Sequence, residues 1–226
     1  MGRIEIIIGI ISSITAIVGV VFSVKTLFSA KRKKEEIKGL NNTVATQISV
    51  VQLDPKSYYN MGNGFYDEGL YMKAIEYFAR AIELDPTYAL SYNGMGSAYY
   101  EIGDYDRAIE YFARAIELDP TFVLSYNGMG SVYYEKRDYD KAIMCFAKAI
   151  ELKYDFAGAY NNMGNVYQQI GYYDGAIEHY RKAIELNPDY EFAYNNMGIV
   201  YQYLGYQDKA NDCFQKADII RHKEMK

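Results

Sequence analysis

The residues in this sequence that could support catalysis or metal binding are scattered, and their spacing fits no reaction. His179 and His222 lie in different parts of the chain, and no cysteine or acidic cluster stands at metal-ligand spacing around either one. Cys145 and Cys213 are 68 residues apart, which argues against a disulfide and fits a reducing compartment. We therefore predict no catalytic residue, no cofactor and no metal site, and a protein that is not an enzyme.

Two acid-rich stretches also lack the spacing of a calcium-binding loop. They contain Asp104 with Asp106 and Asp138 with Asp140. Carboxylates just before and within the first turn of a helix bond to its free N–H groups and oppose its dipole favourably. We interpret these residues as helix N-caps and first-turn charges.

Charge is distributed unevenly along the 226 residues. The formal net charge is −5, yet residues 1–54 carry seven Lys or Arg and four acids, so the remainder of the chain is acidic. Binding to nucleic acid requires a basic surface that contacts phosphates. The acidic remainder therefore predicts no nucleic-acid partner.

The N-terminal segment contains 19 uncharged residues in succession, Ile6 to Val24. At about 1.5 Å per residue such a helix just crosses roughly 30 Å of hydrocarbon. Basic residues 31–34 come after it, and the positive-inside rule then places the rest of the chain in the cytoplasm. We predict a single-pass transmembrane signal-anchor helix within residues 1–30. A cleaved signal peptide is the alternative.

Residues 31–54 are basic at first and then amphipathic. Ile37, Leu40, Val44, Ile48 and Val51 recur at helical spacing. We interpret this juxtamembrane segment as a capping helix that joins the membrane helix to the rest of the chain, with a flexible charged linker over residues 31–42 as the alternative.

From Pro55 onward the sequence repeats every 34 residues. The phrase Ala-Ile-Glu-Leu begins at residues 81, 115, 149 and 183, and we number the positions of each 34-residue frame as places 1 to 34. Five frames stand in succession, at residues 55–88, 89–122, 123–156, 157–190 and 191–224.

Each frame predicts two helices joined by a turn. Aromatic residues at places 4 and 11, Met at place 7 and Gly at place 8 form one stripe of a first helix. Ala at place 20, an aromatic at place 24 and Ala at place 27 belong to a second helix. Gly in mid-helix costs about 1 kcal/mol, so its recurrence indicates that another backbone passes close by. Gly at place 15 predicts a left-handed turn, which Arg137 interrupts in the third frame.

This pattern resembles the tetratricopeptide-repeat (TPR) family over residues 55–226. The resemblance implies an all-α fold, a right-handed α-solenoid of about five helix-turn-helix repeats. It also implies that the first helices line a concave groove, which usually binds a peptide or a helix of a partner protein.

On that basis places 2, 5, 6, 9, 12 and 13 face the groove, which is neutral, rich in amides and tyrosines, and acidic toward its membrane-proximal half. Asn offers both donor and acceptor to a peptide backbone, and Tyr adds rigid contact area. Alternatively, the Asn residues only solvate a polar face. The candidate groove residues are Tyr59, Asn60, Asn63, Asn93, Ser97, Tyr100, Asn127, Ser131, Tyr134, Asn161, Asn162, Asn165, Asn195 and Asn196.

These features together predict a membrane-anchored adaptor for protein-protein interaction. The alternatives are a scaffold that self-associates and a non-catalytic accessory subunit of a membrane-associated complex.

Overall fold

The computed structural model describes residues 53–224, all of which belong to one compact unit, Leu53–Lys226. The predicted membrane helix and residues 31–52 of the juxtamembrane segment after it lie outside the described residues. Within residues 53–224 there are only helices and turns, and no helix there is both long enough and apolar enough to span a bilayer. The ten helices are α3 (Pro55–Asp67), α4 (Tyr71–Leu84), α5 (Ala89–Glu101), α6 (Tyr105–Leu118), α7 (Val123–Glu135), α8 (Tyr139–Leu152), α9 (Ala157–Gln169), α10 (Tyr173–Leu186), α11 (Glu191–Tyr203) and α12 (Gln207–Glu224).

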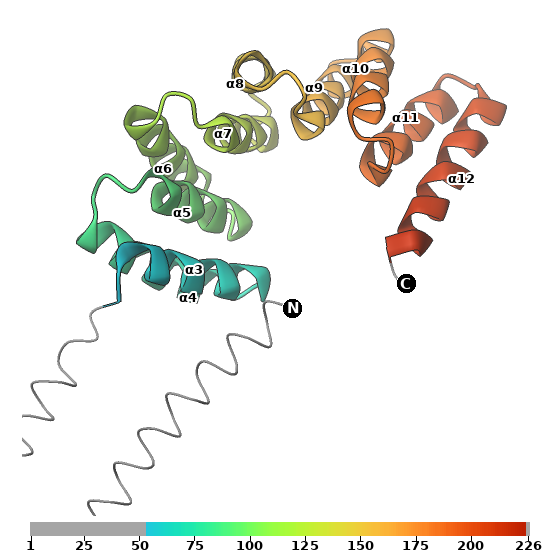
Figure 1. The fold of residues 1–226 in the computed structure, drawn as a ribbon. Helices are drawn as coiled ribbons and strands as arrows, with labels where there is room; N and C mark the ends of the chain where they lie inside the picture. Colours follow the sequence, from blue (N-terminus) through green and yellow to red (C-terminus); the bar gives the residue numbers. More distant parts are fainter. Residues whose placement is uncertain (1–52, 225–226) are drawn as a thin grey trace, which may run out of the picture. The chain divides into compact units, whose positions relative to one another are not determined.

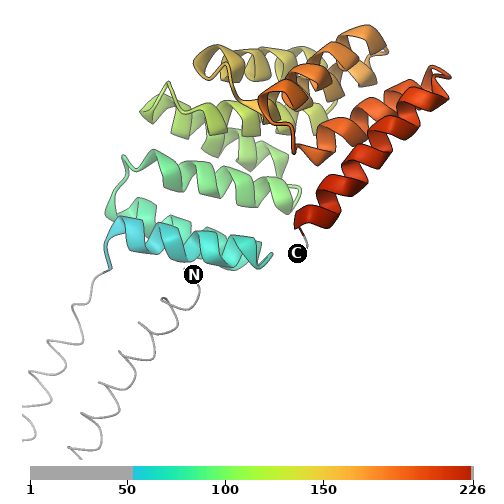
Figure 2. The ribbon, with the colours of Figure 1, turned by 45° about the vertical axis from the view of Figure 1, so that its right-hand side comes forward.

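The helices form five antiparallel pairs, which stack side by side into a curved array (Figure 1). The first helix of each pair, α3, α5, α7, α9 and α11, begins at the first residue of a 34-residue frame. Each first helix contacts the first helix of the next pair, and these helices line the inner side of the array. Figure 2 shows the same stack turned by 45°.

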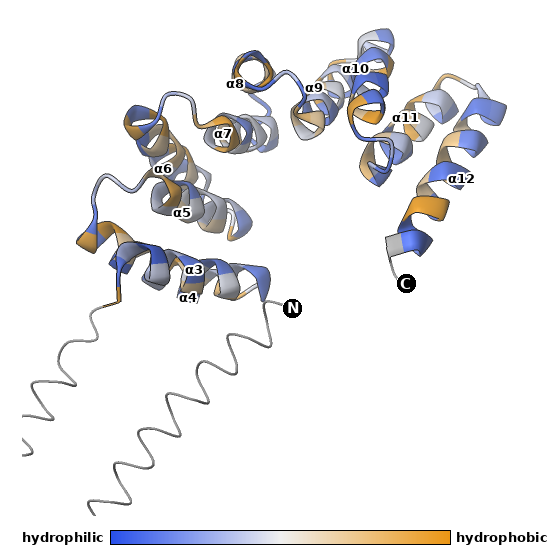
Figure 3. Cartoon of the chain, viewed as in Figure 1, coloured by the Kyte–Doolittle hydropathy of each residue, from blue (hydrophilic) through white to orange (hydrophobic). Residues whose placement is uncertain are grey.

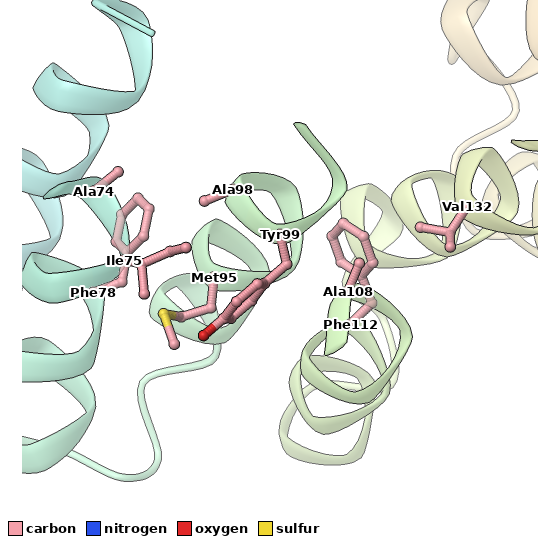
Figure 4. Packing of buried hydrophobic residues seen from close by; sticks show 9 residues of the cluster. All are labelled: Ala74, Ile75, Phe78, Met95, Ala98, Tyr99, Ala108, Phe112 and Val132. Atoms are coloured by element: carbon pink, nitrogen blue, oxygen red, sulfur yellow. The ribbon is translucent and has the colours of Figure 1, made fainter. Parts of the chain in front are cut away.

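The core of the array is built around the aromatic ring at place 24. Phe78, Phe112 and Phe146 are almost completely buried, and Figure 4 shows Phe78 and Phe112 in the first cluster of the core. A Cβ added at Gly62 would lie 2.5 Å from the Phe78 ring, and one added at Gly94 would lie 2.7 Å from it. The expectation that the place 8 glycines, such as Gly62, admit a neighbouring backbone was therefore wrong, because an aromatic ring of the second helix occupies the space.

Neighbouring pairs interlock through small residues at place 10 of the first helix. Ala98, Val132, Val166 and Val200 hold this place in repeats 2 to 5, and none of them is exposed to solvent. The first repeat has Gly64 there, which is exposed and would meet no atom within 4 Å if it carried a Cβ. Place 10 is therefore a packing position between repeats.

The turns between paired helices share one left-handed conformation. Gly69, Gly103, Gly171 and Gly205 have φ values between 74° and 81°, and Arg137 has a φ of 61°. The third turn therefore has the same form as the others, although an L-residue pays about 1–2 kcal/mol for it. The sequence left two outcomes open for this turn, strain at Arg137 or a different shape, and the positive φ of Arg137 shows the strained left-handed form.

The helix boundaries depend on caps more than on proline. Asp104 and Asp138 accept a hydrogen bond from the backbone of the third residue after them, which confirms their prediction as N-caps. By contrast, α8 ends at Leu152 without a nearby proline, at the same place as α4, α6 and α10. Asp54-Pro55 has a different role from the later Asp-Pro pairs: Asp54 caps α3 and Pro55 is its first residue.

The last helix presents a polar face where an additional repeat would pack. Places 21 and 28 are Ile in repeats 1 to 4, but in α12 they are Asn211 and Asp218, both exposed. Figure 3 shows that α12 is mostly hydrophilic, with one apolar turn near its end. Arg221 also links α12 to the first helix of its own repeat, because its Nε donates to Glu191 at 2.8 Å. These substitutions keep the end of the array soluble.

Candidate functional site

A chain of side-chain amides connects the first helices along the inner face. Asn162 donates to the Asn127 Oδ1 at 3.0 Å, and Asn196 donates to both Asn161 and Asn165 at 3.0 Å. Each bond joins one repeat to the preceding one. The same direction holds between repeats 3 and 2, where the Ser125 hydroxyl donates to Asn93 at 2.9 Å. The amides therefore contribute to the stacking of the repeats.

The predicted groove residues differ in how far they are buried and in whether they hydrogen-bond within the protein. Asn161 is only 4% exposed, so its amide is part of the interior rather than open to a partner. Asn195 is half-buried, and its amide donates to Glu191 at 3.4 Å. Ser131 donates to the backbone oxygen of Asn127, in its own helix. Asn60 is exposed, and Asn63 and Ser97 are half-buried. Any contact that a partner makes with the bonded amides uses their second N–H or second lone pair.

The tyrosines of the groove form a second row, next to the amides. Tyr59 packs on Phe78 and Tyr88, with ring centroids 5.8 and 5.6 Å apart. Tyr100 and Tyr134 are half-buried, and each packs on the first tyrosine of its own second helix, at 6.0 Å. Burial raises the pKa of Tyr100 to about 12, with a smaller effect from Glu135. The Tyr100 ring is therefore neutral at physiological pH, and the three packed tyrosines present a rigid surface.

Apolar side chains remain exposed at other inward places. Leu124 is 51% exposed, Phe192 63% and Ile199 47%, at places 2, 2 and 9 of their repeats. Tyr203, at place 13, is also exposed, although its ring contacts Tyr173 at 4.8 Å. These four residues add apolar area to the inner face, although Met72 and Met144 on the second helices are exposed to a similar extent.

Outside the groove, the remaining reactive groups have structural partners. The His179 Nδ1 lies 2.8 Å from the Gly175 carbonyl oxygen, and its ring lies 4.9 Å from that of Tyr167. Burial raises the pKa of the Cys145 thiol to about 11, so it is a poor nucleophile. Among residues 53–224, no group of three or more His, Cys, Asp or Glu side chains is arranged to hold a metal ion.

A hollow of about 860 Å³ lies on the outer side of repeats 4 and 5, but its basic groups are already engaged. Lys182 pairs with Glu185 at 2.9 Å, Arg181 donates to the Tyr201 hydroxyl at 2.8 Å, and Lys209 lies 5.4 Å from the centre of the Tyr201 ring. The basic side chains of this hollow are therefore less available to a ligand than the groups on the inner face.

Sequence reasoning missed two polar features of the inner core. The Tyr180 hydroxyl, fully buried, donates to Gln168 at 2.7 Å and lies 2.9 Å from the Asn165 Oδ1. The Ser91 hydroxyl is buried without a hydrogen-bond partner in the described part of the chain. The Tyr180 network has a signal in the sequence, since Tyr replaces Phe at place 24 only where places 9 and 12 both carry amides.

The fold and this surface together define a helical-repeat protein of the class that binds or organises other proteins. Tetratricopeptide-repeat models match residues 54–121, 111–144, 157–190 and 179–217, and a related TPR model matches residues 130–171. The chain belongs to the tetratricopeptide-repeat family. Proteins of this family generally act as interaction scaffolds.

Solved structures with the same arrangement include three informative neighbours. A crystal structure of MamA is 30% identical, with a TM-score of 0.60, over 73% of this chain and 96% of MamA. YrrB, a TPR protein with an unusual peptide-binding site, is 24% identical with a TM-score of 0.55, over 80% and 93%. Pseudomonas aeruginosa PilF is 21% identical with a TM-score of 0.66, over 72% and 76%. A search of curated proteins gave no significant match.

Proposed function

We propose that this chain is a membrane-anchored, non-catalytic adaptor that binds a peptide or helical segment of a partner protein on the inner face of its first helices. The observation that carries the proposal is the pairing of exposed apolar side chains with amides on one face. Phe192 and Ile199 supply apolar area, while neighbouring amides keep unused donors and acceptors. Family membership, and the peptide-binding site that YrrB is described as having, support this reading.

The groove proposal is tested by removing exposed apolar groups, because their loss leaves the core intact. We expect the double variant F192S/I199S to lose capture of its partner in crosslinking pulldowns from native membranes. The matched control is M72S/M144S, which removes two comparably exposed residues from the second helices, 64% and 70% exposed. Equal recovery of the partner by both double variants would reject the inner face as the binding surface.

The membrane anchor is a separate part of the proposal and rests on residues 6–24, which carry no charge. The basic residues 31–34 beyond them support a cytoplasmic repeat domain. Deleting residues 1–30 should move the protein from the membrane fraction to the soluble fraction after alkaline extraction. A truncated protein that stays in the membrane fraction would refute the anchor and leave the groove proposal standing.

A further inference from the structure

Three first helices end in an acidic residue at the inner, N-terminal half of the array. Asp67, Glu101 and Glu135 are the last residues of α3, α5 and α7, and all three are exposed. A helix C-terminus carries a partial negative charge, so an acid there is unfavourably placed, and the last turn of none of these helices contains a basic residue. The same unfavourable arrangement therefore occurs in three consecutive repeats.

No lysine or arginine within residues 53–224 forms an ion pair with these three carboxylates. Lys136, the residue after Glu135, instead pairs with Asp106 at 2.6 Å. The cations six residues after each acid are also engaged elsewhere: Lys73 lies 5.5 Å from the centre of the Phe65 ring, Arg107 pairs with Asp104 at 2.5 Å, and Lys141 pairs with Asp138 at 2.6 Å. The three carboxylates therefore have no neutralising cation within residues 53–224, and a positively charged group from outside this part of the chain can pair with them.

A pair of tyrosines accompanies each of the three acids. Tyr66, Tyr100 and Tyr134 precede the acids and contact the first tyrosine of the following helix, with ring centroids 5.4, 6.0 and 6.0 Å apart. The Tyr66 hydroxyl donates to Glu101 of the next repeat at 3.2 Å, so the units of repeats 1 and 2 are connected. In repeats 4 and 5 the preceding residue is Gln168 or Gln202, so the row ends after repeat 3.

Aromatic faces, carboxylates and helix C-termini all favour the same ligand group, a guanidinium or an ammonium. Neighbouring first helices contact each other, and packed helices lie about 8–10 Å apart. A peptide in the polyproline II conformation rises about 3.1 Å per residue with three residues per turn, so every third side chain lies on one face and three residues match one step along the row.

From this charge complementarity we propose that the inner face of repeats 1 to 3 binds an extended partner segment with Arg or Lys at about every third residue. Each basic side chain occupies one tyrosine-carboxylate unit. This inference rests on the proposed function. It adds that the partner segment in the groove is basic.

The test uses the full-length chain and three fluorescent nine-residue peptides, measured by anisotropy. One peptide carries Arg at every third position among Ser and Ala, the second has the same composition with its three Arg adjacent, and the third replaces each Arg by Gln. We expect the periodic peptide to bind at least tenfold more tightly than the other two. The triple variant D67N/E101Q/E135Q should remove that preference, whereas E76Q/E110Q/E178Q, with the same change of charge on the second helices, should keep it.

Equal binding of the two arginine peptides, or an equal loss in both triple variants, would reduce the effect to general charge attraction and overturn the proposal. Tighter binding of the glutamine peptide would overturn the proposal that the partner segment is basic. The proposal that the groove binds a peptide would still stand. If none of the peptides binds, the inference is wrong, and the effect of F192S/I199S on partner capture then decides separately whether the groove proposal survives.

Discussion

The Ser125 hydroxyl donates a hydrogen bond to the Asn93 amide oxygen at 2.9 Å and so joins the first helices of repeats 3 and 2. The equivalent serine one repeat earlier, Ser91, is buried and has no hydrogen-bond partner among residues 53–224, because the place that Asn93 occupies is Tyr59 in repeat 1. Two serines at the same place thus differ only in whether an acceptor is present.

This difference predicts opposite effects of the same substitution. Ser125→Ala should destabilise the protein by about 1 kcal/mol, since it removes a hydrogen bond and leaves the Asn93 oxygen without its donor. Ser91→Ala should be neutral or stabilising by up to about 1 kcal/mol, because it removes a buried hydroxyl that lacks a partner. Chemical denaturation of both variants measures the difference. Equal destabilisation would mean that Ser91 has an acceptor in solution.

The two neighbouring glycines of α3 provide a second matched pair. Gly62→Ala should destabilise by about 1–3 kcal/mol, because the new methyl group meets the buried Phe78 ring at 2.5 Å. Gly64→Ala meets nothing within 4 Å, and it should stabilise the helix by about 1 kcal/mol through propensity alone. Thermal unfolding of the two variants distinguishes them. A loss of stability in Gly64→Ala would show that another part of the chain packs against α3.

Arg137 gives a prediction about backbone strain. Arg137→Gly should stabilise by about 1 kcal/mol, because glycine adopts the left-handed conformation without steric cost. Arg137→Ala is the control, since it removes the same charge but keeps a Cβ at φ 61°. If Arg137→Ala stabilises as much as Arg137→Gly, the effect comes from charge and the strain interpretation is wrong.

The buried tyrosines predict a loss of stability at alkaline pH. Burial raises the pKa of Tyr100 to about 12 and that of Tyr180 still higher, so the folded state holds these protons more tightly than the unfolded chain does. Their contribution is therefore complete below pH of about 10, the pKa of an unfolded tyrosine, and is lost as the pH rises above it.

Tyr180→Phe separates that effect from general alkaline denaturation. The variant should lose about 1 kcal/mol at neutral pH, because Gln168 loses its donor, and its stability should fall less steeply above pH of about 10. Urea denaturation at pH values on both sides of 10 tests this prediction. If the stability of the variant falls with pH as steeply as that of the unmodified protein, groups other than Tyr180 cause the alkaline sensitivity.

Much of the fold could be predicted because the 34-residue repeat displays the same pattern five times. A stripe of aromatic, Met and Gly residues that recurs in phase fixes both helices and their turn, and the turn at Arg137 keeps its form because the packing on either side imposes it. The reason for the mid-helix glycines could not be read from sequence, since a neighbouring ring and a neighbouring backbone both exclude a Cβ.

The candidate site was less predictable, because the sequence gives the direction of a side chain but not its partner. Asn161 and Asn162 are adjacent and chemically identical, yet one is 4% exposed and the other half-buried, with its amide donating across to Asn127. The bonds between repeats depend on how closely neighbouring first helices approach, which no single repeat encodes.

The central claim is that the inner face of the first helices holds the partner. The most direct measurement replaces Ile199 by a photoreactive phenylalanine analogue in the full-length protein and irradiates living cells, with Met144 on the outer second helix replaced in the same way as the control. The account predicts a crosslinked product of defined mass at position 199 and none at position 144. The same product from both positions, or one from position 144 alone, would contradict it.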